Sequence, residues 1–167
     1  MNFSLRPMTA DDVAVMRTWR YPEPYQTYDL DSDPGDVDLM LAEIANGERW
    51  FAVVGPGEEG LIGFFGFAVL EDVVEIGLGL RPDLTGRGAG PAFVETGLAF
   101  ARTRWSPSTF ALDVFPWNER AIRAYERAGF VRGDIYIRHF DGGNQRRFLR
   151  MSRPAQEMSD GSQAPPA

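Results

Sequence analysis

The spacing of hydrophobic and polar positions changes several times along the chain, and each spacing predicts an element. Alternating or continuous apolar stretches predict β-strands over residues 2–7, 49–54, 61–70, 73–81, 109–115, 130–140 and 146–151. Apolar residues at helical spacing predict helices over residues 10–20, over residues 34–46, from a glycine-rich turn to residue 104, and over residues 118–128. The first helix is expected to bury Val13, Met16 and Trp19. Thr9 and Asp12 resemble a capping box at its start.

The order of these elements predicts the fold class. Three consecutive strands between residues 49 and 81 are joined by short turns, which predicts an antiparallel meander. The last two strands predict a terminal hairpin. Helices between the strands then give a mixed α/β fold, which is expected to form a single domain over residues 1–153. Residues 154–167 are polar and proline-rich and are expected to form a disordered tail.

The composition excludes several kinds of chemistry. The 167 residues are 44% hydrophobic and 25% charged, as in a soluble globular protein. A net charge of −7 argues against nucleic acid or an anionic membrane as a partner. The chain has no cysteine and one histidine, His139, which excludes a covalent cysteine intermediate and an all-histidine zinc site, so no metal is expected. No apolar run has membrane-spanning length and no signal peptide is evident, so a cytoplasmic protein is expected.

A glycine-rich turn precedes the third helix. Gly86, Gly88 and Gly90 allow several backbone N–H groups to point at one centre, and the helix that follows adds the positive end of its dipole. The turn therefore predicts a phosphate or pyrophosphate site. It is not a P-loop, because the chain has no Gly-x4-Gly-Lys-Ser/Thr run. It is not a dinucleotide fingerprint, because Pro91 and Phe93 stand where the last glycine is needed.

Two more glycines, Gly77 and Gly79, lie inside the strand that leads to this turn. Glycine within a strand marks a bulge or a close approach of the backbone to a ligand. The alternative is packing room beneath a helix. The position of both glycines directly before an anion site favours the ligand, and a bulge is expected there.

The turn resembles a motif of the GNAT superfamily of N-acetyltransferases. The run LRPDLTGRGAGPAF, residues 80–93, is similar to the family's pyrophosphate-binding motif Arg/Gln-x-x-Gly-x-Gly/Ala. Gly88 and Gly90 match the motif, whereas Thr85 stands where arginine or glutamine is usual. The resemblance therefore concerns the backbone of the turn rather than that side chain.

A second motif lies downstream. The run NERAIRAYERAGF, residues 118–130, resembles the family pattern Asn-x-x-Ala-hydrophobic-x-x-Tyr-x-x-x-Gly-Phe at every named position. Asn118 and Tyr125 are nearly two helical turns apart, about 10 Å along one face, with Ile122 between them. Such a face suits a long amphipathic ligand arm. Tyr125 alone would be interpreted as a core aromatic residue, and the two motifs together favour a ligand contact.

The resemblance, which extends over about residues 1–152, implies the GNAT fold. This is a central, mostly antiparallel twisted sheet with a splay between two central strands and helices on both faces. Acyl-coenzyme A would lie in the splay, here between residues 73–81 and residues 109–115. The cofactor-binding residues that the resemblance implies are Leu78, Gly79, Leu80, Thr85, Gly86, Arg87, Gly88, Ala89, Gly90, Asn118 and Tyr125. The side chain of Arg87 is equally compatible with a phosphate contact and with a solvent-exposed position.

The resemblance also implies an acetyl-coenzyme A-dependent N-acetyltransferase in which a neutral primary amine attacks the thioester directly. Tyr125 matches the family's tyrosine that assists the leaving thiolate, and a backbone N–H near Gly79 or Leu80 is the expected oxyanion donor. Glu75 is the first candidate for the base, directly or through water, and it is equally compatible with an ordinary strand carboxylate. Asp113 is the alternative base and is equally compatible with an ion pair to an arginine. A water chain without a dedicated base is the remaining possibility.

The acceptor is a small amine or a peptide N-terminus. Tyr21, Tyr25 and Tyr28 lie in the connector after the first helix, where they either pack on the core or, with Asp113, form a substrate-binding wall. The negative net charge favours cationic acceptors such as polyamines, aminoglycosides or basic peptides. A homodimer is possible, as in many members of the family. The alternative functions are a non-catalytic acyl-coenzyme A-binding sensor and a transferase for longer acyl chains.

Overall fold

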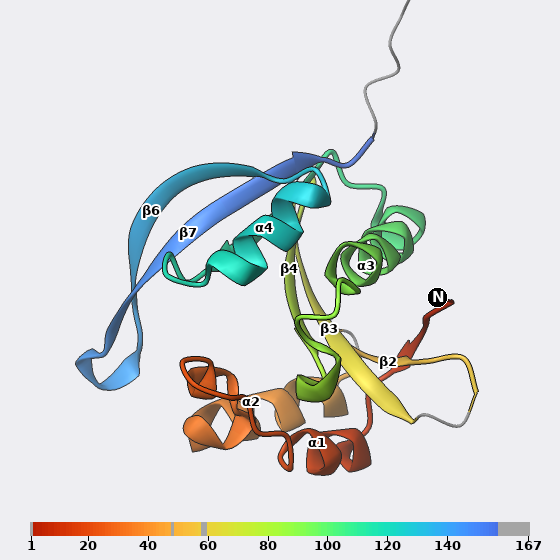
Figure 1. Cartoon of the computed structure of the whole chain (residues 1–167), viewed down its shortest axis with the longest axis vertical. Coiled ribbons are helices and arrows are strands. Elements are labelled where there is room, and N and C mark those ends of the chain that lie inside the picture. Colours follow the sequence, from red (N-terminus) through yellow and green to blue (C-terminus); the bar gives the residue numbers. More distant parts are fainter. Residues whose placement is uncertain (1, 48, 58–59, 157–167) are drawn as a thin grey trace, which may run out of the picture.

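The computed structural model describes residues 2–47, 49–57 and 60–156. Its centre is a seven-stranded sheet in the order β1-β2-β3-β4-β5-β7-β6 (Figure 1). The strands are β1 Ser4–Pro7, β2 Trp50–Val54, β3 Leu61–Leu70, β4 Val73–Leu80, β5 Thr109–Val114, β6 Val131–His139 and β7 Gln145–Pro154. Five of the six neighbouring pairs are antiparallel, and only β4 and β5 run parallel.

Four α-helices and four short 3-10 helices connect the strands within the described residues. The α-helices are α1 Ala10–Met16, α2 Pro34–Ala45, α3 Gly90–Trp105 and α4 Glu119–Arg127. The 3-10 helices are η1 Gln26–Tyr28, η2 Leu30–Ser32, η3 Pro82–Leu84 and η4 Asp141–Gly143. The expected mixed α/β fold, meander and terminal hairpin are confirmed. The first helix is shorter than expected, because it ends at Met16 rather than near Arg20.

Helices cover both faces of the sheet, as expected (Figure 1). The buried residues of α1 and α2, including Val13, Met16 and Val37, pack with β2 and β3 in one apolar cluster. The buried face of α3, including Val94 and Leu98, packs on the opposite face of the sheet in a larger cluster. Alternation along the strands assigns successive side chains to these two layers. The sheet therefore separates an α1/α2 side from an α3/α4 side.

Local sequence signals explain where the helices begin and end. The hydroxyl of Thr9 accepts a hydrogen bond from the N–H of Asp12, whose carboxylate accepts one from the N–H of Thr9, so the expected capping box is confirmed. Arg6 adds two hydrogen bonds to the same carboxylate, at 2.6 and 2.8 Å. This guanidinium is the first cause that holds the pKa of Asp12 below its ordinary value. At the end of α4, Gly129 has φ +86°, the left-handed conformation typical of a residue after a helix.

The parallel strands β4 and β5 diverge after three paired residues. Val73 to Glu75 pair with Thr109 to Ala111, and beyond them the two strands have no further register partners across this seam. The second half of β4 is therefore paired with β3 only. This is the expected splay, and it opens the sheet between residues 76–80 and residues 112–114.

The bulge expected at Gly77 and Gly79 does not exist. The register between β3 and β4 runs without a shift from Gly63 opposite Leu80 to Leu70 opposite Val73. The two glycines are ordinary members of this ladder, and the exposed backbone groups of β4 arise from the splay instead. A divergence of neighbouring strands thus frees N–H groups without an extra residue.

The ordered chain extends past the expected domain boundary at residue 153. Pro154 belongs to β7, and Ala155 is buried, with its N–H donating to the carbonyl of Ser108 at 2.9 Å. The start of the tail is corrected accordingly, and residues 157–167 lie outside the described residues. No helix in the described part of the chain is long and apolar enough to cross a membrane.

Candidate active site

The largest of three neighbouring cavities lies between α3 and α4 and has a volume of about 600 Å³. It is lined by the end of β4, the glycine-rich turn, the first turn of α3 and one side of α4. We call it the α3–α4 cavity. It is long enough to run from the turn to the side chain of Tyr125, because both line it. A cavity with a backbone-lined end and an apolar middle suits an extended ligand with a phosphate group.

The turn at one end of this cavity has the conformation of an anion site. Gly86 and Gly88 have φ values of +71° and +81°, which a residue with a side chain adopts only with strain. A Cβ at Gly88 would meet no atom within 4 Å, so the space beside the backbone is open. The turn leads directly into α3, whose first N–H groups add to the positive potential. Thr85 has its hydroxyl bonded to the carbonyl of Pro82, at 2.7 Å.

Two elements of this site come from α4. Asn118 is the N-cap of the helix, since its side chain accepts from the N–H of Ala121 at 3.2 Å. Its amide also donates to the hydroxyl of Tyr28 at 2.9 Å, and the residue is 6% exposed. Asn118 therefore couples the start of α4 to the connector between α1 and α2. Its side chain also lines the cavity in the splay that is described below, so a contact with a ligand stays a prediction.

Tyr125 lies two turns further along α4. Its ring packs edge-on against Phe130, and the side chain lines the α3–α4 cavity. Burial, with a smaller contribution from Tyr28, raises the pKa of its hydroxyl above the ordinary tyrosine value. The phenol therefore keeps its proton at neutral pH and is available as a donor.

A second cavity, of about 260 Å³, lies in the splay itself, and we call it the splay cavity. It is lined by residues 76–80 of β4, by the end of β5 and by the start of α4. The three connector tyrosines also line it, as do Asp113, Asn118 and Tyr125. The structure thus brings the predicted substrate-binding residues and the predicted catalytic tyrosine to one cavity. This cavity shares Tyr125 and residues 78–80 with the α3–α4 cavity, so the two adjoin one another.

The connector tyrosines are held by specific contacts. The hydroxyl of Tyr21 donates to the carbonyl of Leu80 at 2.8 Å, which ties the connector to the end of β4. Tyr28 packs against Phe115 and Trp117 and receives the bond from Asn118. The tyrosines therefore pack as a layer and also line the cavity, and their role in substrate binding stays a prediction.

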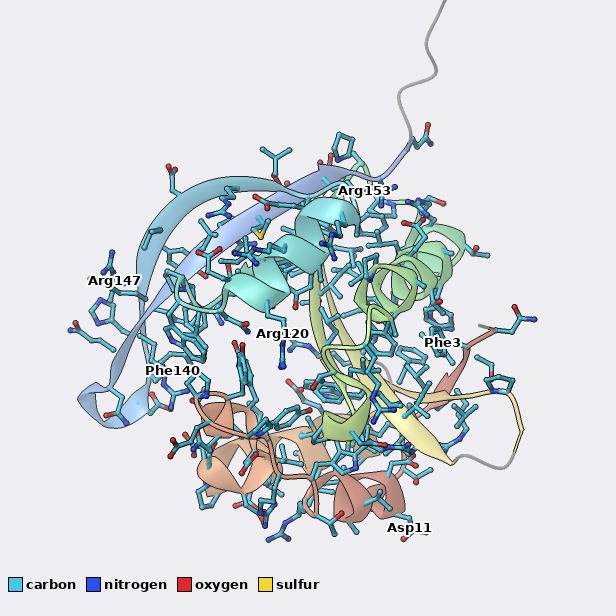
Figure 2. The ribbon with its side chains drawn as sticks, viewed as in Figure 1. Phe3, Asp11, Arg120, Phe140, Arg147 and Arg153 are labelled. Carbon is cyan, nitrogen blue, oxygen red and sulfur yellow. The ribbon has the colours of Figure 1, made fainter. Side chains whose placement is uncertain are left out.

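Arg120 is a site residue that the sequence reasoning missed. Its guanidinium lies over the ring of Tyr25, 3.9 Å from the ring centroid, and the side chain lines both cavities. Figure 2 shows it extending from α4 toward the connector. A signal existed, because a cation in the first turn of a helix opposes the dipole and is favourable only beside an anion or another partner. The aromatic face of Tyr25 and the neighbouring glycine-rich turn supply such surroundings.

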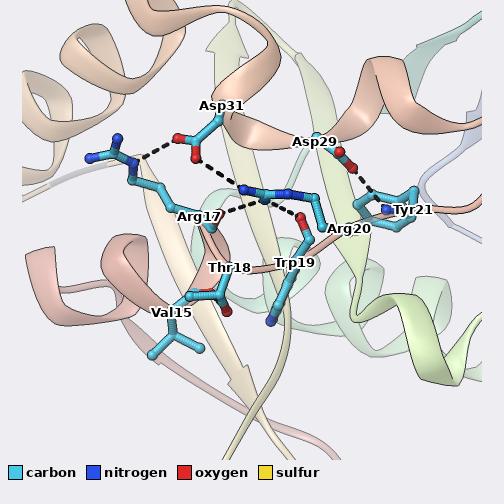
Figure 3. A network of polar contacts seen from close by, with 8 residues as sticks. All are labelled: Val15, Arg17, Thr18, Trp19, Arg20, Tyr21, Asp29 and Asp31. Carbon is cyan, nitrogen blue, oxygen red and sulfur yellow. Dashed lines mark hydrogen bonds and ion pairs between the residues drawn. The ribbon is translucent and has the colours of Figure 1, made fainter.

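The connector is also fastened to the end of α1 (Figure 3). Arg17 and Arg20 both contact the carboxylate of Asp31, at 2.7 and 3.4 Å. Arg20 further donates to the carbonyls of Arg17 and Trp19, and the N–H of Tyr21 donates to Asp29. These bonds fold the connector back on α1 and fix the direction from which Tyr21 enters the splay cavity.

The third cavity, of about 220 Å³, lies on the α1/α2 side of the sheet, and we call it the rear cavity. Its charged side chains come mainly from four strands, β4, β5, β6 and β7, and they are ion-paired. Arg150 contacts Glu75 at 2.8 Å and Asp113 at 3.0 Å. Arg138 contacts Asp113 at 2.8 Å, and the hydroxyl of Tyr136 donates to the same carboxylate. The expectation that Asp113 pairs with an arginine is confirmed.

Several predicted residues are not brought to the splay. Glu75 lines the rear cavity but not the splay cavity, so the sheet lies between it and most of the other predicted residues. Arg87 is exposed, and neither it nor Ala89 lines any of the three cavities. His139 is exposed on the terminal hairpin. In the described residues, no three His, Cys, Asp or Glu side chains are grouped in a way that could hold a metal ion.

Comparison with known proteins gives a consistent result. The sequence profile of the acetyltransferase (GNAT) domain matches residues 2–131. Spermidine N(1)-acetyltransferase of Escherichia coli is 27% identical over 159 residues, which cover 88% of this chain and 83% of the relative.

Two solved structures share the fold. AAC(6')-Ib in complex with ribostamycin and coenzyme A superposes with a TM-score of 0.72 at 22% identity, covering 96% of this chain and 99% of that chain. Spermidine N-acetyltransferase from Vibrio cholerae in complex with coenzyme A and spermine gives 0.67 at 20% identity, covering 92% and 95%.

A splayed central sheet with a glycine-rich turn at a helix N-terminus, together with the matched profile, defines an N-acyltransferase. The chain belongs to the GNAT acetyltransferase family, as the match over most of its length shows.

Proposed function

We propose that this protein transfers the acetyl group of acetyl-coenzyme A to a small primary amine. The observation that carries the proposal is that the α3–α4 cavity and the splay cavity adjoin at residues 78–80 and Tyr125. One end of this path is a backbone cradle suited to the pyrophosphate. The other end has exposed strand backbone and a protonated phenol. A ligand that spans both ends needs a phosphate group, a long arm and a reactive terminus, which is the chemistry of an acyl-coenzyme A.

The residues present fit this cosubstrate. A Cβ at Gly88 would meet no atom within 4 Å, and one at Gly86 would meet only the guanidinium of Arg120 at 3.9 Å, so oxygen atoms of a pyrophosphate can approach the backbone. Arg120 adds a positive charge between the turn and the splay. When bound, acetyl-coenzyme A supplies the thioester carbonyl that the acceptor attacks. The apolar middle of the cavity suits its pantetheine arm.

The direction of the backbone groups in β4 assigns the oxyanion donors. The N–H of Arg81 donates to Ile62 in β3, and the carbonyl of Leu80 faces away from β3 toward Tyr21. Because successive residues of an antiparallel strand direct their polar groups to opposite sides, the N–H groups of Leu78 and Leu80 point into the splay. The N–H group of Gly79 points toward β3 instead. We propose Leu78 and Leu80 as the donors to the developing negative charge on the carbonyl oxygen.

Tyr125 acts as the acid in this proposal. The lone pair of the neutral amine forms a C–N bond to the carbonyl carbon, the C–S bond breaks, and the electron pair leaves on sulfur. The phenol of Tyr125 protonates that thiolate, and the nitrogen loses a proton. The raised pKa of Tyr125 keeps the donor protonated before each turnover. The products are an N-acetylated amine and the free thiol of coenzyme A.

Glu75 remains the candidate base, although it lies on the other side of the sheet from Tyr125. It lines the rear cavity, beyond the sheet from Tyr125, and its carboxylate accepts a hydrogen bond from Arg150 at 2.8 Å. A proton released on this side of the sheet reaches it through water rather than by direct contact. The acid and the base are therefore proposed to work on opposite sides of the splay.

The decisive experiment measures release of coenzyme A thiol from the full chain with a panel of amines, and identifies products by mass spectrometry. Polyamines and aminoglycosides form the first arm, because of the net charge of −7 and the names of the relatives. Amino acids form the second arm, because Arg138 and Arg150 line the rear cavity. Acetylated product with any panel member supports the proposal. Tight binding of acetyl-coenzyme A in calorimetry without any product contradicts it and favours a non-catalytic binding module.

A further inference from the structure

The rear cavity and the splay cavity meet at three residues. Ile76, Gly77 and Asp113 line both of them. Ile76 belongs to the apolar cluster on the α3/α4 side, so alternation directs its neighbours Glu75 and Gly77 to the α1/α2 side. The same rule directs Asp113 to that side, because Leu112 and Val114 pack in the α3/α4 cluster. The junction of the two cavities therefore connects the two faces of the sheet at the splay.

Gly77 differs from the other glycines in this part of the sheet. A Cβ at Gly63 would lie 2.6 Å from a backbone oxygen, and at Gly66 or Gly79 it would lie 2.6 or 2.3 Å from an aromatic ring. Packing thus requires glycine at those three positions. A Cβ at Gly77 would have only the carbonyl oxygen of Gly66 within 4 Å, at 4.0 Å, and its φ is not in the left-handed region. The fold would accept a side chain at Gly77, so packing does not explain the glycine.

Asp113 supplies a second observation at the same junction. Its Oδ2 atom is occupied by Tyr136 and Arg138, whereas Oδ1 is buried and has no hydrogen-bond partner in the structure. Arg150 Nε lies 3.0 Å from Oδ1, an ion-pair contact that lacks the alignment of a hydrogen bond. A buried carboxylate oxygen without an aligned donor is costly unless a ligand supplies one. An amine N–H is such a donor.

We propose that Gly77 is the specificity-determining position of the acceptor path. The absence of a side chain there keeps the rear cavity joined to the splay cavity, and the acceptor amine passes beside Gly77 to the thioester, with Asp113 Oδ1 receiving its N–H. This inference rests on the proposed function, since it assigns the route by which that reaction obtains its amine. The acceptor and the cosubstrate then approach the reacting carbon from opposite faces of the sheet.

The test compares Gly77→Ala and Gly77→Val with the wild-type chain, using the best amine of the panel. The added methyl groups occupy the junction, so the acceptor KM is expected to rise about ten-fold for alanine and more for valine. Binding of acetyl-coenzyme A should change less than about two-fold, because Gly77 does not line the α3–α4 cavity. The melting temperature should not fall, because the Cβ meets open space. Gly35→Ala, at a glycine that lines none of the three cavities, is the matched control.

A second pair of variants tests the role of Asp113 Oδ1. Asp113→Asn is expected to raise the acceptor KM about ten-fold or more and to leave cosubstrate binding unchanged. Tyr136→Phe removes a partner of Oδ2 only, and it should leave the acceptor KM within about two-fold of wild type.

The outcomes separate the inference from the function on which it rests. If the wild type acetylates an amine and both Gly77 variants keep its acceptor KM, the path beside Gly77 is wrong and the proposed function stands. If Asp113→Asn and Tyr136→Phe have equal effects, Oδ1 is not the receiving atom. If the wild type acetylates no amine of the panel, the proposed function fails and the acceptor path fails with it.

Discussion

The two sides of the splay are built in different ways. On the α3/α4 side, the α3–α4 cavity has at one end a turn with glycines in left-handed conformations and a helix N-terminus. On the α1/α2 side, the rear cavity is formed by charged side chains from β4, β5, β6 and β7 in a network of ion pairs. In the proposed function, the first arrangement would bind the pyrophosphate, a group common to all acyl-coenzyme A molecules. The second is suited to distinguishing one amine from another, because side chains can vary while the backbone cradle is kept.

This difference has a consequence for mutagenesis. Changes on the α3/α4 side should affect cosubstrate binding and the chemical step for every acceptor alike. Changes on the α1/α2 side should alter the acceptor KM or its pH dependence and leave cosubstrate binding intact. Four variants, given in order of decreasing expected effect, test whether the two sides of the splay differ in this way.

The largest effect is expected for Gly88→Asp. Aspartate tolerates a positive φ better than most residues, so the main change is a negative charge inside the cradle. Repulsion of the pyrophosphate should weaken acetyl-coenzyme A binding about 100-fold in calorimetry. Gly57→Asp is the matched control, because Gly57 also has a positive φ and open space around its Cβ. Equal affinity of the two variants would show that the turn does not hold the pyrophosphate.

Tyr125→Phe should have the next largest effect. Loss of the proton donor is expected to lower kcat by about ten-fold or more for every acceptor of the panel, with little change in cosubstrate affinity. Steady-state kinetics and calorimetry measure the two quantities. Tyr136→Phe serves as the control for removal of a phenol outside the α3–α4 cavity. An unchanged kcat would remove Tyr125 from the mechanism.

Glu75→Gln tests the opposite side of the splay. If Glu75 takes up the amine proton through water, kcat/KM for the acceptor should fall about five-fold at neutral pH. The deficit should shrink as pH rises, because the amine then loses its proton to solvent without help. Glu71→Gln, in the exposed turn between β3 and β4, is the control. A deficit that is the same at every pH would assign Glu75 a structural role through Arg150.

The smallest effect on activity is expected for Asp12→Asn, in the scaffold of the α1/α2 side. The bond from Arg6, as the largest cause, and the bonds from Thr9 lower the folded-state pKa of Asp12, and they outweigh burial, which acts in the opposite direction. The stability that this carboxylate contributes is therefore complete above its unfolded pKa, near pH 4, and is lost as the pH falls through the lower folded value.

The variant should lose about 1–2 kcal/mol in urea unfolding at pH 7, and less at acidic pH. Cosubstrate binding should be unchanged. Asp11→Asn, at the exposed neighbouring position, is the control and should cost almost nothing. A loss that grows as the pH falls would contradict the assigned sign.

Much of the fold was predictable because it depends on local patterns. The strand and helix periods and the capping box at Thr9 and Asp12 are short-range signals, and the structure confirms them. The expected bulge at Gly77 and Gly79 was wrong, because the same exposure of backbone arises from strand divergence, which no local pattern encodes. The position of Ala155 is likewise held by a hydrogen bond to the distant carbonyl of Ser108.

The candidate site also contains residues that local motifs could predict and residues whose roles depend on distant contacts. The glycine-rich turn and the helix that carries Asn118 and Tyr125 are contiguous segments, so their motifs could be recognised in the chain. The bond from Asn118 to Tyr28 spans 90 residues, and its consequence, that Asn118 is a coupling residue, could not be foreseen. Arg120 was missed because its partner Tyr25 lies in the connector. The partners of Glu75 and Asp113 come from the terminal hairpin, far along the chain.

The sequence by itself determined the order of elements, because this follows from periodicity. Two motifs indicated the family, and the conformational freedom of glycine predicted a backbone anion site. The tertiary structure decided which side chains share a cavity, which side of the sheet Glu75 occupies and which glycine lies at the junction of two cavities. The physical reason is the alternation of strand side chains combined with the splay. A shift of one residue in the register of a strand would move each of its side chains to the other face of the sheet. Only the assembled sheet fixes that register.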